Sequence, residues 1–147
     1  MESNRFSSGH FAMQGRAHID QRRKPVVAVL DDDDWFRKIV GVLLQDQGFD
    51  VTSSWNKQEF LESLPEINPD VIISDVQSPV MDGVTFLRLL QSDPRSSLIP
   101  VIIITGHPSP ESLDLYSLGA YLVMMKPIDI DSLSSAVEGA TRYLSIT

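Results

Sequence analysis

The sequence of 147 residues contains no cysteine and no apolar run long enough to cross a membrane. Without cysteine the chain forms no disulfide bond, offers no thiolate nucleophile and has no cysteine-based metal site, and we expect a cytoplasmic protein. Apolar runs such as Val101 to Ile104 fall far short of the roughly 18 apolar residues that a bilayer requires. The N-terminal region also lacks the apolar segment of a secretory signal peptide. We therefore expect no membrane partner.

Basic side chains are scarce in most of the chain. Residues 25–147 carry seven basic and eighteen acidic side chains, whereas residues 1–24 carry five basic and two acidic ones. The acidic excess repels the phosphate backbone of nucleic acids, so we expect no direct nucleic-acid partner and a surface better suited to cations. Residues 1–24 are rich in serine, glycine, glutamine and arginine and have no apolar period. They are expected to form a flexible basic tail before a single domain at 25–147.

Five short apolar runs predict strands, because continuous runs of this length are typical of strands buried on both faces of a sheet. The run that follows Gly48 is the weakest of them. The predicted strands are Val26 to Leu30, Phe49 to Thr52, Val71 to Ser74, Ile99 to Ile104 and Tyr121 to Met125.

Segments with apolar residues at helical spacing alternate with these strands. Gly48 is expected to end the first helix and Pro65 the second, which is short, and Ser109 is the expected N-cap of the fourth. The predicted helices lie around residues 36–43, 60–64, 84–90, 110–118 and 131–143.

The order of strand and helix, repeated five times, predicts an α/β fold. Buried strands that alternate with helices require a parallel sheet with helices on both faces and right-handed crossovers. We expect a flavodoxin-like doubly wound sheet of five parallel strands in the order 2-1-3-4-5, with five helices.

Polar side chains end four of the apolar runs. Because the carboxyl ends of parallel strands meet at one edge of the sheet, and strands one and three are neighbours, Asp31, Asp32 and Asp75 are expected to lie close together. Three adjacent carboxylates repel one another unless a cation joins them, and hard oxygen ligands suit Mg²⁺. Lys126 can neutralise a phosphoryl group and the hydroxyl of Thr105 can donate to one of its oxygens. A carboxylate in this setting is a candidate nucleophile for phosphorus.

These residues resemble the response-regulator receiver family over nearly all of 25–145. The resemblance rests on the acidic residues after the first strand, on the segment around the central aspartate, and on the threonine and lysine that end the last two strands. It implies a cis peptide bond before Pro127. The matching segments are Val-Leu-Asp31-Asp32-Asp33, Ile-Ile-Ser-Asp75-Val-Gln-Ser-Pro79-Val-Met-Asp82-Gly83, Ile-Ile-Thr105-Gly-His, and Gly119-Ala120 followed by Lys126-Pro127.

The resemblance also implies a function and a set of roles. Asp75 would accept a phosphoryl group from a sensor histidine kinase or a phosphotransfer protein, and Lys126 and Thr105 would hold the phosphoryl oxygens. Mg²⁺ would be bound by Asp32 and Asp75, by Asp31 directly or through water, and by the backbone carbonyl of Gln77. By the same resemblance the domain would be a stand-alone switch and not an enzyme that turns over a separate substrate. Its output would be a contact with an unknown protein through the fourth helix, fifth strand and fifth helix.

Among the departures from the family pattern, one bears on the output of the domain. Val123 stands three residues before Lys126, where the family usually has an aromatic residue that moves inward after phosphorylation. Tyr121 lies two residues before Val123 and is expected to project from the same face of the strand. We hypothesise that Tyr121 takes over part of this aromatic role.

Two other functions are compatible with parts of the pattern. A Mg²⁺-dependent phosphohydrolase of the haloacid-dehalogenase type would use Asp31 as nucleophile with Asp33, Thr105 and Lys126, and would give Asp75 no role. The chain is short for that fold and lacks its late acidic pair. A receiver-like module that only docks to partners is the second alternative. Val123 gives it some weight, whereas the complete set of site residues argues against it.

Overall fold

Five parallel strands form one sheet in the computed structural model, which describes residues 23–77, 80–106 and 111–146. The strands are β2 (Val26–Leu30), β3 (Asp50–Ser54), β4 (Val71–Asp75), β5 (Val101–Thr105) and β6 (Leu122–Met125). Neighbouring strands lie in the order β3-β2-β4-β5-β6, and each neighbouring pair is parallel. This is the predicted order 2-1-3-4-5, so the expected doubly wound fold is confirmed.

Six helices are found in the described ranges rather than the predicted five. They are α1 (Asp34–Asp46), α2 (Lys57–Glu62), α3 (Leu64–Ile67), α4 (Gly83–Ser92), α5 (Glu111–Ser117) and α6 (Ile130–Ile146). The extra helix arises because Pro65 does not end the second helix, so that prediction is wrong. Ser63 is the C-cap of α2, and Pro65 lies in the first turn of α3. A proline is tolerated there because the first backbone N–H groups of a helix have no intrahelical acceptor.

The expected ends of two other helices have different outcomes. Gly48 directly follows Gln47, the C-cap of α1, and has a φ of 100°, so glycine ends this helix as predicted. Ser109, the predicted N-cap of the fourth helix, lies outside the described residues.

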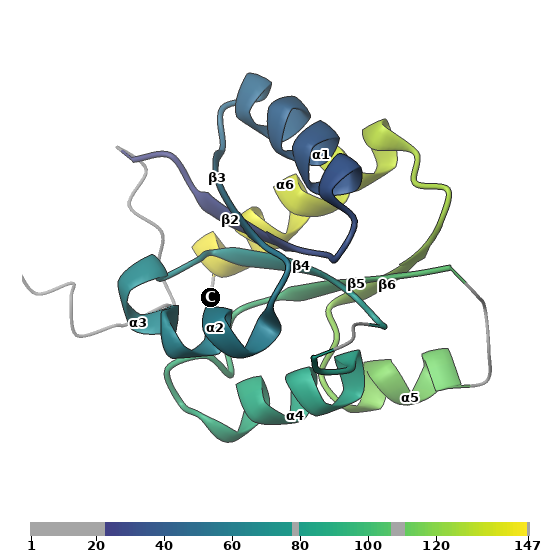
Figure 1. The fold of residues 1–147 in the computed structure, drawn as a ribbon. Coiled ribbons are helices and arrows are strands. Elements are labelled where there is room, and N and C mark those ends of the chain that lie inside the picture. Colours follow the sequence, from purple (N-terminus) through teal and green to yellow (C-terminus); the bar gives the residue numbers. More distant parts are fainter. Residues whose placement is uncertain (1–22, 78–79, 107–110, 147) are drawn as a thin grey trace, which may run out of the picture.

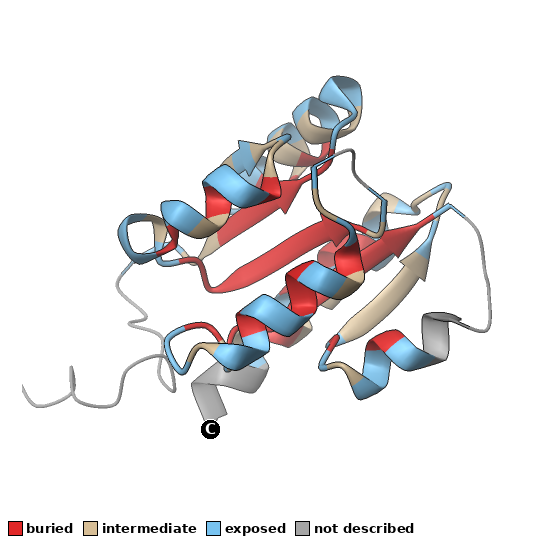
Figure 2. Cartoon of the chain, turned by 60° about the horizontal axis from the view of Figure 1, so that its bottom comes forward, coloured by how far each residue is buried: buried red, intermediate tan, exposed pale blue. Residues whose placement is uncertain are grey.

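The helices cover both faces of the sheet. Helices α1 and α6 lie on one face, and α2, α3, α4 and α5 lie on the other (Figure 1). Each face therefore has its own apolar core, and the central strands of the sheet are buried, whereas the edge strands β3 and β6 are half-buried or exposed (Figure 2). All five residues of β4 and all five of β5 are buried. This burial explains why their sequences are continuous apolar runs rather than alternating ones.

Successive residues of β2 show how the two cores are divided. Val27 and Val29 belong to the core under α1 and α6, whereas Ala28 and Leu30 belong to the core under α4. Alternate side chains of a strand point to opposite faces, so an apolar residue is required at each position. The polar residues of this segment are consequently displaced to the end of the strand.

Residues 1–22 of the predicted tail lie outside the described residues. At its end, Arg23 donates through both terminal nitrogens to Asp70, over 2.9 and 3.0 Å. Asp70 is 1% exposed and also accepts from the backbone N–H of Val26 at 2.7 Å. This contact attaches Arg23 to the amino ends of β2 and β4.

None of the helices in the described part of the chain has both the length and the apolar character that a membrane span needs.

Candidate functional site

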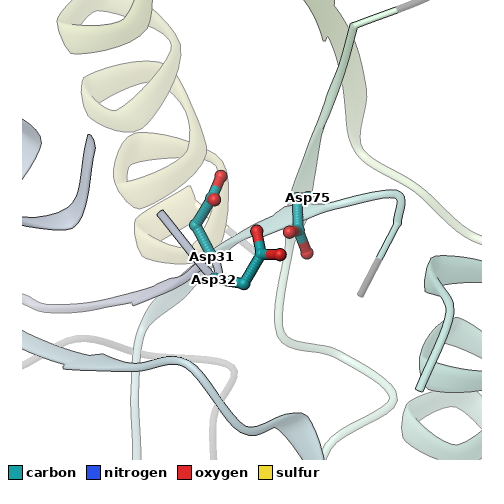
Figure 3. A group of neighbouring side chains, drawn as sticks. All are labelled: Asp31, Asp32 and Asp75. Carbon is teal, nitrogen blue, oxygen red and sulfur yellow. The ribbon is translucent and has the colours of Figure 1, made fainter. Parts of the chain in front are cut away.

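Three carboxylates meet at the carboxyl edge of the sheet, where β2 and β4 end. Asp75 is the last residue of β4, and Asp31 and Asp32 directly follow β2. The two strands are neighbours in parallel register, with Leu30 beside Ser74. One oxygen atom from each carboxylate lies within 4.8 Å of the other two. The side chain of Asp32 points toward Asp75 (Figure 3). The sheet thus brings together the three acids that the sequence places at its strand ends.

The carboxyl group of Asp75 is buried at this edge, as is that of Asp31. Asp75 is 5% exposed, whereas Asp32 is exposed. Burial raises the pKa of the Asp75 carboxyl group above the usual aspartate value. A hydrogen bond from Lys57 and its charge lower this pKa, and the nearby charges of Asp31 and Asp32 raise it. The net direction is upward, so the ionised form of Asp75 needs a positive charge close by.

Lys57 supplies such a charge, and the sequence did not predict it. Its Nζ lies 2.5 Å from Oδ1 of Asp75, and the lysine is only 2% exposed. Lys57 is the first residue of α2 and follows the N-cap Asn56. This turn comes after β3, whose carboxyl end lies at the same edge as those of β2 and β4. The predicted topology places the carboxyl end of β3 at this edge. Because β3 is a polar edge strand, however, the sequence does not show clearly where the strand ends.

Lys126 also reaches the acidic cluster, but at another carboxylate. Its Nζ lies 3.3 Å from Oδ2 of Asp31 and 5.0 Å from the ring centroid of Phe36. The peptide bond between Lys126 and Pro127 is cis, as the resemblance implies. Lys126 therefore lies at the predicted edge, with Asp31 rather than Asp75 as its ion-pair partner.

Thr105 and Gln77 complete the predicted set. Thr105 is the last residue of β5 and is 7% exposed, and its backbone carbonyl accepts from the N–H of Lys126 at 2.8 Å. Gln77 lies in the loop after β4, two residues beyond Asp75. Residues 78–79 of this loop lie outside the described residues. The carbonyl of Gln77 as a metal ligand stays a prediction.

The loop after β4 is held close to the strand that it leaves. The backbone N–H of Gly83 donates to the carbonyl of Val76 at 2.7 Å. Asp82 is the N-cap of α4 and accepts from the N–H of Thr85 at 2.8 Å. These contacts bring the start of α4 back to the segment that carries Asp75.

Tyr121 and Val123 have different surroundings. Val123 is partly buried against the core under α4 and α5, and its N–H donates to the hydroxyl of Tyr116 at 2.9 Å. Tyr121 directly precedes β6, and its hydroxyl lies 3.4 Å from the position that a Cβ on Gly139 of α6 would take. Tyr121 thus lies along the edge between β6 and α6. Its proposed part in switching stays a prediction.

Comparisons with known proteins agree on one family. The family model described as the response regulator receiver domain matches residues 27–138. The DNA-binding transcriptional regulator NtrC of Escherichia coli is 35% identical over 122 residues, which are 82% of this chain and 26% of NtrC. The transcriptional regulatory protein FixJ of Bradyrhizobium diazoefficiens is 34% identical over 117 residues, which are 79% of this chain and 56% of FixJ. The chain thus spans about a quarter of NtrC and about half of FixJ.

The solved structures give the same result. The chemotaxis response regulator CheY4 of Vibrio cholerae is 29% identical and superposes with a TM-score of 0.73, over 80% of this chain and 98% of that one. A receiver domain from a signal transduction histidine kinase of Syntrophus aciditrophicus is 27% identical, with a TM-score of 0.77 over 84% of this chain and 94% of that one. None of these similarities supports a phosphohydrolase of the haloacid-dehalogenase type.

Proposed function

Because the chain belongs to the response regulator receiver domain family, we propose that Asp75 accepts a phosphoryl group from a histidine kinase or a phosphotransfer protein. The protein is a receiver domain of the kind found in two-component response regulators. The observation that carries the assignment to Asp75 is its position, buried at the end of β4 with oxygens of Asp31 and Asp32 within 4.8 Å.

Asp75 acts as the nucleophile in this proposal. One of its carboxylate oxygens forms a bond to phosphorus while the bond from phosphorus to the donor breaks and leaves its electron pair on the donor. The product is an acyl phosphate on Asp75. Because the transition state of phosphoryl transfer is loose, the protein contributes mainly by positioning the groups and by stabilising charge. A buried strand end with neighbouring charged groups suits both requirements.

The three carboxylates fit a divalent cation. Their oxygens lie within 4.8 Å of one another and are the hard ligands that Mg²⁺ prefers. We propose Asp31, Asp32, Asp75 and the backbone carbonyl of Gln77 as the protein's ligands. When bound, Mg²⁺ would supply positive charge that offsets the negative charge of the carboxylates and of the transferred group.

Lys126 and Thr105 are proposed to hold the phosphoryl oxygens. Both end strands at the same edge as Asp75, and the N–H of Lys126 is bonded to the carbonyl of Thr105. In this role Lys126 would leave Asp31 for a phosphoryl oxygen, and the hydroxyl of Thr105 would donate to another. Phosphorylation would then favour the state in which both groups reach the phosphate, as a shift of population.

The output is proposed to be a protein contact at the surface of α5, β6 and α6. The acidic excess of residues 25–147, with eighteen acidic and seven basic side chains, disfavours direct contact of this domain with nucleic acid. The description of NtrC as DNA-binding applies to that whole protein, of which this chain matches 26%. A location in the cytoplasm, and the lack of turnover of a separate substrate, belong to the same proposal.

Phosphorylation with acetyl phosphate and Mg²⁺, followed by mass-spectrometric mapping, tests the acceptor. We expect the phosphoryl label on Asp75 and its loss in Asp75→Asn. Asp33→Asn is the matched control, because Asp33 caps α1 in the neighbouring loop and asparagine also caps helices. Label on Asp31, loss of label in Asp33→Asn, or repeated turnover of phosphomonoesters would contradict the proposal and favour the phosphohydrolase.

A further inference from the structure

Lys57 is a buried cation that the proposed reaction does not use. Lysine is rarely fully buried unless it is paired, and this one is 2% exposed. Its Nζ donates to Oδ1 of Asp75 at 2.5 Å, inside the candidate site rather than at the surface. A buried ammonium group without a partner is strongly destabilising, so Asp75 is the group that makes the buried position of Lys57 tolerable.

The helix that carries Lys57 does not itself favour a cation there. Lys57 is the first residue of α2, directly after the N-cap Asn56. The N-terminal end of a helix carries partial positive charge, so acidic rather than basic side chains are stabilised in its first turn. Local helix stability therefore does not explain the lysine, whereas its contact with Asp75 does.

The carboxylate of Asp75 has two oxygens, which limits how many groups can bind to it at the same time. In the proposed function the carboxylate of Asp75 would both form the bond to phosphorus and help to hold Mg²⁺. In this structure Oδ1 already accepts a hydrogen bond from Lys57. An ammonium group and a divalent cation on the same buried oxygen would repel each other. Lys57 and Mg²⁺ therefore compete for the carboxylate.

We propose that Lys57 is a resident cation of the phosphorylation site that competes with Mg²⁺ for Asp75 and weakens Mg²⁺ binding to the unphosphorylated protein. The proposal rests on the proposed function of Asp75, Asp31 and Asp32 as Mg²⁺ ligands. It extends that function, because Mg²⁺ must displace an ion pair that is already formed. The affinity of such a site depends on the charge of its ligands, and Lys57 offsets part of that charge.

Mg²⁺ titrations followed by the amide resonances of Asp32 and Asp75 test the competition. In Lys57→Met, which keeps a long side chain and removes the charge, we expect the Kd for Mg²⁺ to fall roughly tenfold, because a charge-assisted hydrogen bond no longer opposes binding. Lys57→Arg keeps the charge and should retain the weak binding of the wild type. Lys38→Met removes an exposed lysine of α1 and should change the Kd less than about twofold, because solvent screens that charge.

A measurement on the wild-type protein keeps the test independent of how the variants fold. The Nζ and Cε resonances of Lys57 should shift during the Mg²⁺ titration with the same midpoint as the amide of Asp75. Equal Kd values for wild type and Lys57→Met, or Lys57 resonances that do not respond to Mg²⁺, would overturn the competition and leave the Mg²⁺ site intact. Absence of Mg²⁺ binding in both proteins would overturn the proposed metal site as well.

Discussion

Charge balance at the level of single residues decides what the site can bind. Lys57 and Lys126 contact two of the three carboxylates, Asp75 and Asp31, at 2.5 and 3.3 Å. The two ammonium groups do not cancel three negative charges, so the cluster keeps a net attraction for a cation. Burial at Asp75 strengthens that attraction, because charges interact more strongly away from water.

Gly83 has little room for a side chain beside the loop that follows Asp75. A Cβ there would lie 3.1 Å from Cα and 3.2 Å from the carbonyl oxygen of Val76, both backbone atoms. We expect Gly83→Ala to lower the free energy of unfolding by roughly 1–3 kcal/mol, the usual cost of overpacking, as measured by urea denaturation.

The matched control for this change is Gly41→Ala in α1. A Cβ at Gly41 would meet Cγ1 of Val51 at 3.7 Å, which is ordinary contact. Alanine is favoured over glycine within helices by about 1 kcal/mol, so this variant should be as stable as the wild type or more stable. Equal stability of Gly83→Ala and the wild type would show that the loop can move away from α4.

At the level of whole elements, the helices that start at the site begin with side-chain caps. Asp33 caps α1, Asn56 caps α2 and Asp82 caps α4, each directly after the loop that leaves a strand. A cap satisfies backbone N–H groups at the first turn and so defines where the helix starts. These caps help to fix the loop that carries Asp31, the first turn of α2 with Lys57, and the segment after Asp75.

Asp82→Ala tests the contribution of the α4 cap. We expect it to cost about 1 kcal/mol of unfolding free energy at neutral pH, a typical value for a lost cap. The backbone hydrogen bond from Thr85 holds the pKa of Asp82 below its usual value. The ionised cap therefore stabilises the fold above the usual aspartate pKa, and this contribution is lost as the pH falls toward the lower folded pKa. Urea denaturation at a series of pH values should show that the difference in unfolding free energy between wild type and Asp82→Ala becomes smaller as the pH falls.

Asp114→Ala in α5 is the control for this pH series, because Asp114 is an exposed acid within a helix. It should leave the stability nearly unchanged at each pH. A constant difference between wild type and Asp82→Ala from neutral to acid pH would contradict an electrostatic contribution of the cap.

For the whole molecule, the contact between Arg23 and Asp70 joins the end of the N-terminal region to the edge of the sheet opposite the site. Asp70 is 1% exposed, so its charge is costly without a partner. We expect Arg23→Ala to lower the unfolding free energy by roughly 1–3 kcal/mol, the usual range for weakening a buried charged hydrogen bond. Thermal or urea denaturation measures the change.

Lys24→Ala controls for the loss of one basic charge at the adjacent, exposed position. It should have little effect. If Arg23→Ala were no more destabilising than Lys24→Ala, the contact of Arg23 with Asp70 would not stabilise the domain. Arg23 would then be part of the tail at 1–24.

The boundary between α2 and α3 could not be predicted from Pro65 alone. Proline is incompatible with helix interiors but suits first turns, so Pro65 alone does not distinguish the end of α2 from the start of α3. The observed turn at Ser63 separates them. The error changed the number of helices and left the topology unaffected, because α2 and α3 lie within the same connection between β3 and β4.

The doubly wound sheet and the meeting of Asp31, Asp32 and Asp75 could both be predicted from the order of residues along the chain. Strands buried on both faces must be apolar throughout, so their polar residues collect at the strand ends, and parallel strands place those ends at one edge. Which lysine contacts which carboxylate could not be predicted in this way and is set by the packing of the folded chain. Lys57 and Asp75 come from separate elements, β3 is too polar to mark its own end clearly, and an ion pair between distant segments has no local pattern. Packing against the sheet places the buried lysine beside the proposed phosphoacceptor.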